Sequence, residues 1–495
     1  MMKAFRAIVA LTFRNAMRSH IFQLLLVLLL LCVTVIPISV SVGKTEDLIR
    51  VSLLYSLWSV SAILALSSLW LGCYIMSHDI DSYQIHMVVS KPVSRITVWL
   101  GKWVGINLIN IVLLLISGLV VYGVVMYRYQ SAGEEDIRFS ERAQARRNAE
   151  SERDRIRNQI LVGRRSYMPE KRDPEAAAQE AVRRRVIDLQ KEGKVLSDEE
   201  IQKMYTDYKE QIDQLPVEVI PIEVDANGRP LAVNSHTWVF KNIPEDLNKK
   251  AVVLRFRPYL NKIASEDQRL STMWWAVQNP VLVKSAGEDG SFRAVTDEPE
   301  SYFTGEFHEI PLPYNVEDMP QGMVGEDGTV KIRVINADIQ KGKHYYQVND
   351  GPKLLVPVCS FEMNYLRAMA AMILQLMLLS GLACAFGGFL TMPTAIFMVA
   401  SYLLFGSLSM VLTDSSFYVS TAWDHLGQFL AQALLLIVIP LQNFDVTNLL
   451  SGGDLIEFSL LGELFFNYFL LRGVPLFVLG IWLYVRRELG SAVRK

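Results

Sequence analysis

The sequence predicts a membrane all-α bundle of six transmembrane helices plus a re-entrant segment, with an inserted extracytoplasmic α-hairpin and β-sandwich domain. Apolar residues make up 51% of the 495 residues, which excludes a disordered or purely soluble chain. They concentrate in the two ends of the chain, whereas residues 134–357 carry most of the charge. We therefore divide the chain into an N-terminal membrane half (1–130), an extracytoplasmic helical hairpin (131–215), an extracytoplasmic β-sandwich (216–358) and a C-terminal membrane half (359–495).

The membrane halves contain seven apolar runs. A bilayer core requires about 20 apolar residues in a helix, because no backbone group can be left unpaired in hydrocarbon. Five runs meet this requirement clearly, and they cover residues 21–42, 53–76, 100–127, 366–390 and 393–412. Two are weaker: 426–441 is short and ends at Pro440, and 464–485 contains Arg472. The first run is too long for a signal-peptide core and lacks a cleavage pattern, so we expect a retained anchor.

Basic residues at both ends of the chain predict the orientation. They are Lys3, Arg6, Arg14 and Arg18 before the first run, and Arg486, Arg487, Arg494 and Lys495 after the last. Because cytoplasmic flanks are rich in Lys and Arg, both termini are expected to be cytoplasmic. An even number of crossings follows, and we expect the shortest run, 426–441, to dip in and return. Residues 131–358 are then extracytoplasmic, and the loop at 77–99 is cytoplasmic.

The polar middle of the chain changes character near residue 216. Residues 134–215 are rich in helix-favouring Ala, Glu, Arg and Gln and show no strand pattern, which predicts a helical hairpin or short coiled coil. Pro174 after Asp173 predicts a helix start, and Ser197 with Glu200 has the spacing of a capping box. From 216 onward, short runs at 217–224, 237–240, 252–256 and 330–334 are separated by turn residues such as Asp327-Gly328, which predicts a β-sandwich.

The cytoplasmic loop between the second and third spans carries the candidate site. Asp79 and Asp81 lie where a helix would begin, a position that favours negative charge, and apolar residues follow them. We expect a short helix on the membrane surface, with Lys91 and Arg95 near the headgroups. The candidate residues are Asp79, Ile80, Asp81, Gln84, Ile85, Val88, Lys91 and Arg95. The alternative is an ordinary amphipathic connector with basic anchors.

The loop motif Ser90-Lys91-Pro92-Val93-Ser94-Arg95, followed by Gly101-Lys102-Trp103-Val104-Gly105, resembles that of type-2 ABC transporter permeases. The similarity is greatest to the copper-enzyme maturation and gliding-associated permeases. Three further stretches also fit this family: residues 13–19 before the first span, 361–367 before the fourth, and Arg486-Arg487-Glu488-Leu489 at the end. The resemblance covers both membrane halves but not residues 134–357.

The resemblance implies the permease subunit of an ATP-driven transporter in the bacterial cytoplasmic membrane, which moves a substrate outward. Residues 79–90 would dock as a coupling helix on a separate ABC ATPase subunit, which binds the ATP and Mg. The expected partners are this ATPase, a second permease copy and the lipid bilayer. A periplasmic protein is a further candidate partner, and no nucleic acid is expected.

The chain itself lacks the motifs of an enzyme. It contains no Gly-x-x-x-x-Gly-Lys-Ser/Thr loop, no His-Glu-x-x-His and no Cys-x-x-Cys, so we expect no catalytic residue, metal site or bound cofactor. Arg472 is a candidate intramembrane polar site, and the alternative is that it reaches the outer interface. A second hypothesis for the whole chain is a membrane-anchored assembly or sensory protein whose extracytoplasmic domain binds a ligand.

Overall fold

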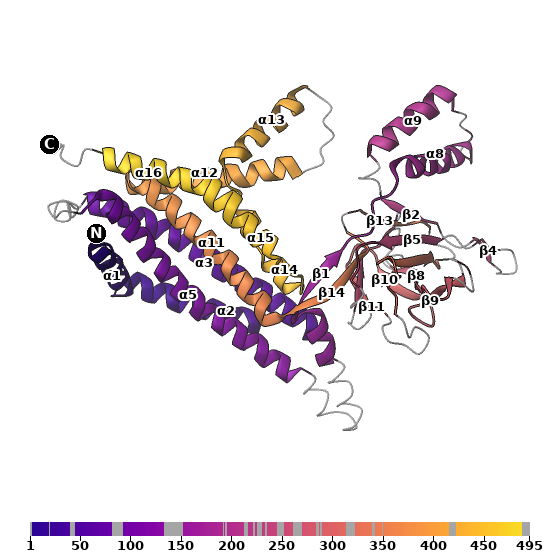
Figure 1. The fold of residues 1–495 in the computed structure, drawn as a ribbon, viewed down its shortest axis with the longest axis horizontal. Helices are drawn as coiled ribbons and strands as arrows, with labels where there is room; N and C mark the ends of the chain where they lie inside the picture. Colours follow the sequence, from indigo (N-terminus) through magenta and orange to yellow (C-terminus); the bar gives the residue numbers. More distant parts are fainter. Residues whose placement is uncertain are drawn as a thin grey trace. The chain divides into compact units, whose positions relative to one another are not determined.

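The computed structural model describes the whole chain except residues 1, 19, 40–44, 82–92, 133–151, 192, 194–195, 212–215, 221–222, 225–229, 233–234, 245–251, 261–269, 284–286, 288–289, 313–321, 339–341, 349, 415–421 and 488–495. The chain forms two compact units (Figure 1). The helical unit comprises Met1–Gly163 and Cys359–Lys495, and the inserted unit comprises Arg164–Val358.

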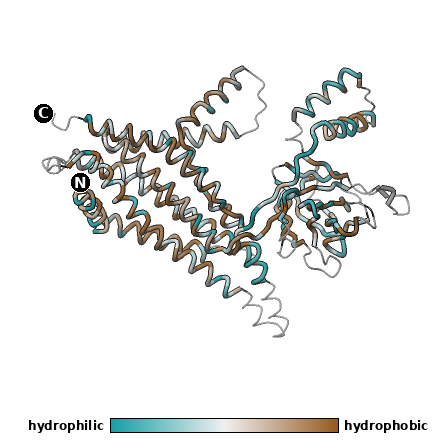
Figure 2. The backbone as a smooth tube through the Cα atoms, in the orientation of Figure 1, coloured by the Kyte–Doolittle hydropathy of each residue, from teal (hydrophilic) through white to brown (hydrophobic). Residues whose placement is uncertain are grey.

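The helical unit is built from long apolar helices, which are brown in Figure 2. They are α1 (Met2–Arg18), α2 (His20–Ser39), α3 (Thr45–Asp81), α5 (Arg95–Ser131), α11 (Phe361–Gly387), α12 (Met392–Asp414), α13 (Ala422–Ile437), the 3-10 turn η3 (Leu441–Phe444), α14 (Thr447–Ser451), α15 (Phe458–Glu463), the π-helix η4 (Leu464–Gly473) and α16 (Val474–Arg486). With 37 residues each, α3 and α5 are about 55 Å long, so both exceed the roughly 30 Å of hydrocarbon.

Among the described residues, five helices are long and apolar enough to cross a membrane, or up to seven if each bent pair counts as one span. The five are Thr45–His78, Arg95–Ser131, Phe361–Gly387, Met392–Val411 and Phe458–Arg486. The last of these includes the run at 464–485 with Arg472, which was expected to be one of the two weaker spans. The run at 21–42 passes only as part of a pair bent by 64°, and the run at 426–441 only as part of a pair bent by 53°. The prediction of a multi-pass, mostly helical protein is therefore confirmed.

Helix α11 is the central helix of its unit. It buries 67% of its apolar window, against 22% to 44% for the other four candidate spans. Glycines on both sides allow its neighbours to approach closely, as small residues do in membrane bundles. A Cβ at Gly387 would lie 2.9 Å from the Cα of Cys73 in α3, and one at Gly381 would overlap the Phe477 ring in α16.

The inserted unit contains strands and two helices. They are β1 (Val162–Tyr167), α8 (Pro174–Lys191), α9 (Asp198–Gln211), β2 (Val217–Val219), β3 (Glu223–Val224), β4 (Pro230–Ala232), β5 (Ser235–Phe240), β6 (Val253–Phe256), β7 (Tyr259–Leu260), β8 (Leu270–Gln278), β9 (Phe292–Ala294), β10 (Glu300–Phe303), β11 (His308–Pro311), β12 (Val330–Asn336), β13 (His344–Tyr346) and β14 (Lys353–Ser360). The described strands form sheets ordered β1-β14-β6-β11, β10-β8-β12-β5 with β9 beside β8, β2-β13-β7, and β3-β4.

The two largest sheets share one apolar core. Strand β12 alternates buried and half-buried residues, and its register pairs Val334 with Trp275 of β8. Leu254 of β6 and Leu354 of β14, from the other sheet, belong to the same buried cluster. The predicted runs at 237–240, 252–256 and 330–334 coincide with β5, β6 and β12. Alternation of buried and exposed residues is the sequence signal of a strand with one buried face.

Two local predictions need correction. Residues 134–215 were expected to lack strands, yet β1 forms at Val162–Tyr167. Its pattern is concealed because buried Arg164 is charged and pairs with Glu309 of β11. The single run expected at 217–224 forms two short strands, β2 and β3, in different sheets. Helices α8 and α9 do pack on each other, within the part of the chain where a hairpin was expected.

Candidate functional site

The structure describes the two flanks of the predicted cytoplasmic loop. The backbone of Asp79, Ile80 and Asp81 forms the last turn of α3. The candidates Gln84, Ile85, Val88 and Lys91 lie outside the described residues. Arg95 is the first residue of α5, whose N-cap is Ser94 with its Oγ accepting from the Thr97 backbone nitrogen. Asp79 and Asp81 were expected to begin a helix in the loop at 77–99, but they end α3, which continues to Asp81 because no Gly or Pro interrupts residues 73–81.

Both flanks are hydrogen-bonded to the C-terminal half of the chain. On the α3 side, the buried Ser77 Oγ lies 3.2 Å from the carbonyl oxygen of Gly387 and 3.4 Å from that of Leu390. On the α5 side, Arg95 Nη1 donates to the carbonyl oxygens of Val485 at 2.8 Å and Arg487 at 3.0 Å.

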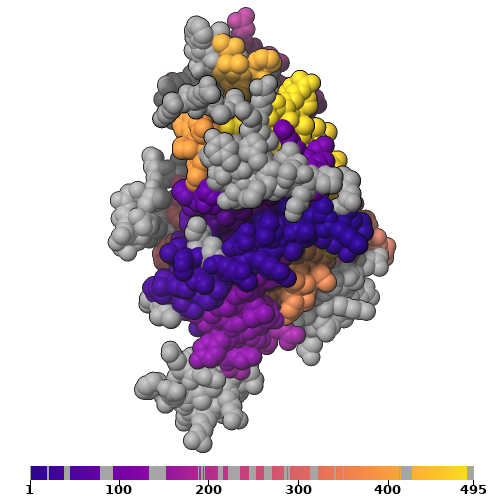
Figure 3. Space-filling model, turned by 90° about the vertical axis from the view of Figure 1, so that its left-hand side faces the viewer, coloured from indigo at the N-terminus to yellow at the C-terminus, as the bar shows by residue number. Residues whose placement is uncertain are grey.

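The ends of α3, α5, α11 and α16 therefore gather at one end of the helical unit, which we call the loop end. Arg487 adds a link between α16 and α11, because its Nη1 lies 3.4 Å from the Gly388 carbonyl oxygen. Helix α1 packs along the first turns of α5, where Gly101 faces Ile8. Helices α1 and α16 both reach this end of the unit in Figure 1, and Figure 3 faces it, with indigo atoms of the first helices and yellow atoms of the last at the surface.

Polar side chains continue from the loop end into the helix interfaces. Lys102 Nζ, although buried, donates to the Ile75 carbonyl oxygen at 3.0 Å, which links α5 to α3. Trp99 Nε1 donates to the Cys384 carbonyl oxygen at 3.3 Å, which links α5 to α11. Deeper pairs are Asn107 with Ser380, Asn110 with Ser68 and Gln375 with Ser61. Each such bond contributes about 0.6 kcal/mol in a membrane protein, and together they link α3, α5 and α11 to one another.

The chain leaves the helical unit and returns to it at the end opposite the loop. Arg128, near the C-terminus of α5, donates to the Pro37 carbonyl oxygen and so places the end of α2 there. Asn364, in the first turn of α11, donates to the Asp454 carbonyl oxygen at 2.8 Å and accepts from the Ile456 nitrogen at 2.9 Å. Since α5 and α11 begin or end at the loop, their other ends mark the far end of the unit.

Arg472 lies beside a break in the apolar segment that follows α12. Helix α13 ends before Pro440, which leaves its last carbonyls without helical partners. Arg472 Nη1 donates to one of them, Leu435, at 2.6 Å, and its guanidinium lies 5.0 Å from the Tyr468 ring centroid. Tyr402 Oη accepts from the Ile439 nitrogen at 3.2 Å. The Arg472 side chain thus donates a hydrogen bond to a carbonyl that has no partner within α13. Non-helical backbone inside a membrane requires such partners.

A serine, a histidine and an aspartate meet in the inserted unit, and the sequence spacing did not reveal them. Ser271 Oγ lies 3.0 Å from Nε2 of His344 and 3.5 Å from its Nδ1, and Asp338 Oδ2 lies 2.9 Å from the same Nε2, so the shorter contacts of both oxygens go to one nitrogen. A nucleophilic triad needs the hydroxyl and the carboxylate on different ring nitrogens. All three side chains are also buried, so this cluster packs the interior. In the described part of the chain, no group of three His, Cys, Asp or Glu could hold a metal ion.

No family model, curated protein or solved structure matches this chain.

Proposed function

We propose that this chain is the permease subunit of a type-2 ABC transporter in the bacterial cytoplasmic membrane. It exports a substrate, whereas a separate nucleotide-binding subunit hydrolyses ATP with Mg. The observation that carries the proposal is the pair of links at the loop end. Ser77 and Arg95, which flank the loop that resembles a coupling helix, are bonded to the C-terminal ends of α11 and α16. Force on this loop would therefore reach both halves of the membrane bundle.

The positions of the helix ends support six crossings with both termini cytoplasmic. Helices α2, α3, α5 and α11 each connect the loop end to the far end. From Gly387 the chain reaches the far end at Asp454, and α15 to α16 bring it back to Arg487. The intervening α12 to α14 then make one net crossing, and the α13 segment with its break at Pro440 is the re-entrant part.

The expected mechanism follows from the rigid core. The ATPase would bind residues 79–90, and its movement on ATP binding would displace α3, α5 and α11 together because polar bonds join them. Helix α11 runs from the loop end to the point where the chain returns from the inserted unit. In this scheme the inserted unit lies outside the cytoplasm, two permease copies form the path, and the chain itself contributes no catalytic group.

Co-purification tests this proposal. Full-length tagged protein extracted from its native membranes is expected to bring down an ATP-hydrolysing protein in equal stoichiometry. Val88→Asp, in the loop, is expected to abolish that association because it puts a charge into an apolar contact. Val348→Asp is the matched control, since Val348 is an exposed residue of the inserted unit. If no ATPase co-purifies, or if both variants release it equally, the permease assignment is wrong and the membrane-anchored ligand-binding alternative replaces it.

A further inference from the structure

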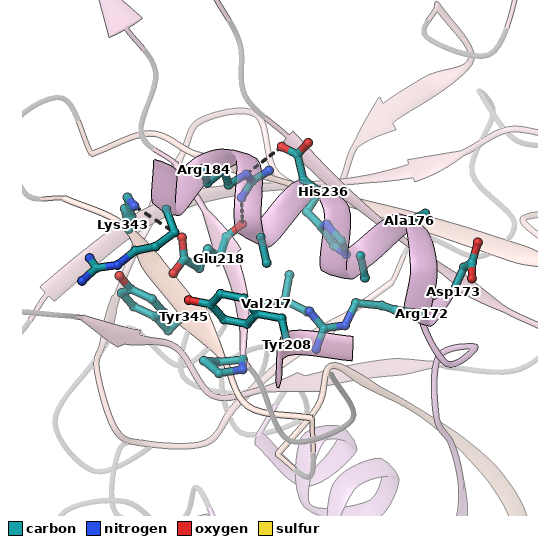
Figure 4. Close-up of a pocket in the computed structure, with 15 residues that line it drawn as sticks. Arg172, Asp173, Ala176, Arg184, Tyr208, Val217, Glu218, His236, Lys343 and Tyr345 are labelled. Atoms are coloured by element: carbon teal, nitrogen blue, oxygen red, sulfur yellow. Dashed lines mark hydrogen bonds and ion pairs between the residues drawn. The ribbon is translucent and has the colours of Figure 1, made fainter. Parts of the chain in front are cut away.

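The inserted unit contains a cavity of about 690 Å³ between α8, α9 and strands β2, β5 and β13 (Figure 4). This volume lies within the range of pockets that hold small molecules. One wall is the face of α8 that carries the short side chains of Ala176, Ala177 and Ala181. Tyr208 of α9 and Tyr345 of β13 provide aromatic surface. The cavity thus combines an apolar body with polar groups that arrive from several elements.

Positive charge exceeds negative charge around this cavity. Its lining includes four cationic side chains, Arg172, Arg184, Arg185 and Lys343, against three carboxylates, Asp173, Glu180 and Glu218. The N-terminus of α8 also lies at the cavity, where Asp173 Oδ1 accepts from the Glu175 nitrogen at 3.1 Å and so offsets part of the positive end of the helix dipole.

Two basic side chains of the cavity lining, Arg184 and Lys343, form ion pairs with its carboxylates. Arg184 Nε lies 2.8 Å from the Glu180 carboxylate, and its Nη1 donates to the Glu218 carbonyl oxygen at 3.3 Å. Lys343 Nζ lies 3.4 Å from the Glu218 carboxylate. These contacts fix the basic side chains in position, and a fixed guanidinium has further donors for a ligand carboxylate or phosphate.

The pKa of His236 depends on its burial and on the positive charges around the cavity. Its ring packs edge-on against Trp238, with centroids 4.7 Å apart. Burial, followed by the charges of Arg172 and Arg184, lowers its pKa from 6.5 to about 4. The imidazole is therefore neutral at pH 7 and can hydrogen-bond to a ligand. Burial penalises a charge of either sign, but the part of the shift that comes from Arg172 and Arg184 marks a positive potential, which favours an anion.

We propose that this cavity binds a small organic anion. The acidic group lies near Arg172 and Arg184 beside His236, and the apolar part lies against the alanine face of α8 and Tyr208. Figure 4 shows that Arg172, Tyr208 and His236 come from three different parts of the chain and surround one space. A carboxylate and a phosphate share the chemistry that this site recognises. The inference does not depend on the permease function, because it concerns the inserted unit alone.

Fluorine NMR on the full chain in lipid nanodiscs tests the charge preference. The probes are para-fluorobenzoate, para-fluorobenzamide and para-fluorobenzylammonium, which share a shape and differ in charge. The anion is expected to bind at least about tenfold more tightly than the other two, because a charge-assisted hydrogen bond contributes about that factor. Para-fluorophenyl phosphate, compared with the benzoate, distinguishes a phosphate site from a carboxylate site. Equal binding of the anionic and neutral probes would overturn the proposal.

Variants on α8 test the location. Arg184→Gln is expected to weaken para-fluorobenzoate binding about tenfold, and Ala177→Leu is expected to weaken it by filling the cavity. Arg183→Gln is the matched control, because Arg183 is an exposed neighbour on the same helix that does not line the cavity. Since Arg184 also bonds to Glu180, Arg172→Gln replaces it if the first variant fails to fold. If Arg183→Gln weakens binding as much as the cavity variants, the anion binds elsewhere and the proposal is wrong.

Discussion

Glu309 of β11 pairs with two arginines in the inserted unit. Arg164 lies 2.7 Å from its Oε2, and Arg255 lies 2.8 Å from its Oε1. Burial alone would raise the pKa of Glu309, but the charges and hydrogen bonds of Arg164 and then Arg255 outweigh it and hold the pKa below its usual range. The three residues belong to β1, β6 and β11, so the cluster ties three strands of one sheet together.

Removing this carboxylate should destabilise the inserted unit. Glu309→Gln removes the negative charge that pairs with buried Arg164 and half-buried Arg255, and we expect a loss of about 3 kcal/mol in the free energy of unfolding at pH 7. Glu170→Gln, which breaks an exposed pair with Lys241, is the control and should cost less than about 1 kcal/mol. Denaturant unfolding followed by tryptophan fluorescence measures both. Similar losses in the two variants would show that the buried cluster contributes no more than a surface ion pair.

The same cluster predicts a pH dependence. Because the folded pKa of Glu309 is lower than the unfolded one, its ionised form contributes stability above the unfolded pKa. That contribution is lost as the pH falls through the folded pKa. The difference in unfolding free energy between the native protein and Glu309→Gln should therefore shrink at acid pH. A difference that stays constant down to acid pH would contradict the ion-pair explanation.

Removal of the Arg184 charge should raise the pKa of His236. Removing a positive neighbour makes protonation easier, so Arg184→Gln should raise the pKa of His236 from about 4 towards its ordinary 6.5. In the native protein, stability should fall as the pH drops from 6.5 towards 4, because the unfolded chain binds a proton there that the folded chain does not. NMR titration of labelled histidine measures the pKa directly. Arg183→Gln should leave it unchanged, and an equal shift in that variant would exclude a local effect.

At the scale of helices and strands, local signals could be predicted from the sequence and long-range ones could not. The capping box at Ser197 forms as expected, with the Ser197 nitrogen 2.8 Å from Glu200 Oε2. Gly328 also takes the positive φ, +69°, that its turn requires. Strand β1 was missed because burial of Arg164 depends on Glu309, a partner 145 residues away. The capping box and the Gly328 turn each depend on a few neighbouring residues, whereas strand β1 depends on the whole sheet.

The candidate site shows the same division. Arg95 could be identified from its motif, but its partners Val485 and Arg487 come from the other end of the chain. The role of Arg472 depends on where α13 breaks, and hydropathy alone does not place the Leu435 carbonyl beside it. The cavity in the inserted unit combines residues from α8, α9 and three strands, and no sequence spacing brings them together.

Close packing of α11 against α16 should be sensitive to a single methyl group. A Cβ at Gly381 would overlap the ring of Phe477, whereas one at Gly462 in α15 would meet nothing within 4 Å. Gly381→Ala should therefore destabilise the helical unit by about 1–3 kcal/mol through overpacking. Gly462→Ala should be neutral or stabilising by up to about 1 kcal/mol, since Ala favours helix. Thermal unfolding in detergent measures both, and equal stability would mean that the two helices do not pack this closely.

Arg95 should transmit motion from the loop to α16. In the proposed complex with an ATPase subunit, ATP is expected to change hydrogen exchange at the ends of both α11 and α16. Arg95→Gln removes the bonds to Val485 and Arg487. It should abolish the change in α16 while the Ser77 link preserves the change in α11. Arg50→Gln, which removes a salt bridge within α3 at the far end, is the control. An unchanged response of α16 in Arg95→Gln would show that another route connects the loop to it.

For the whole molecule, the length of α5 sets the topology. Its 37 residues run from the loop end to the far end, about 55 Å, which is long enough for one crossing, and the proposed topology then puts the loop and the inserted unit on opposite sides of a membrane. Gln84→Cys and Val348→Cys test this in a background where Cys32 and Cys359, the two half-buried native cysteines, are replaced by serine. A membrane-impermeant maleimide should label Val348→Cys on spheroplasts, and Gln84→Cys only after permeabilisation. Labelling of both positions from the same side would mean that α5 does not span. It would remove the geometric basis for placing the docking loop beside an ATPase in the cytoplasm.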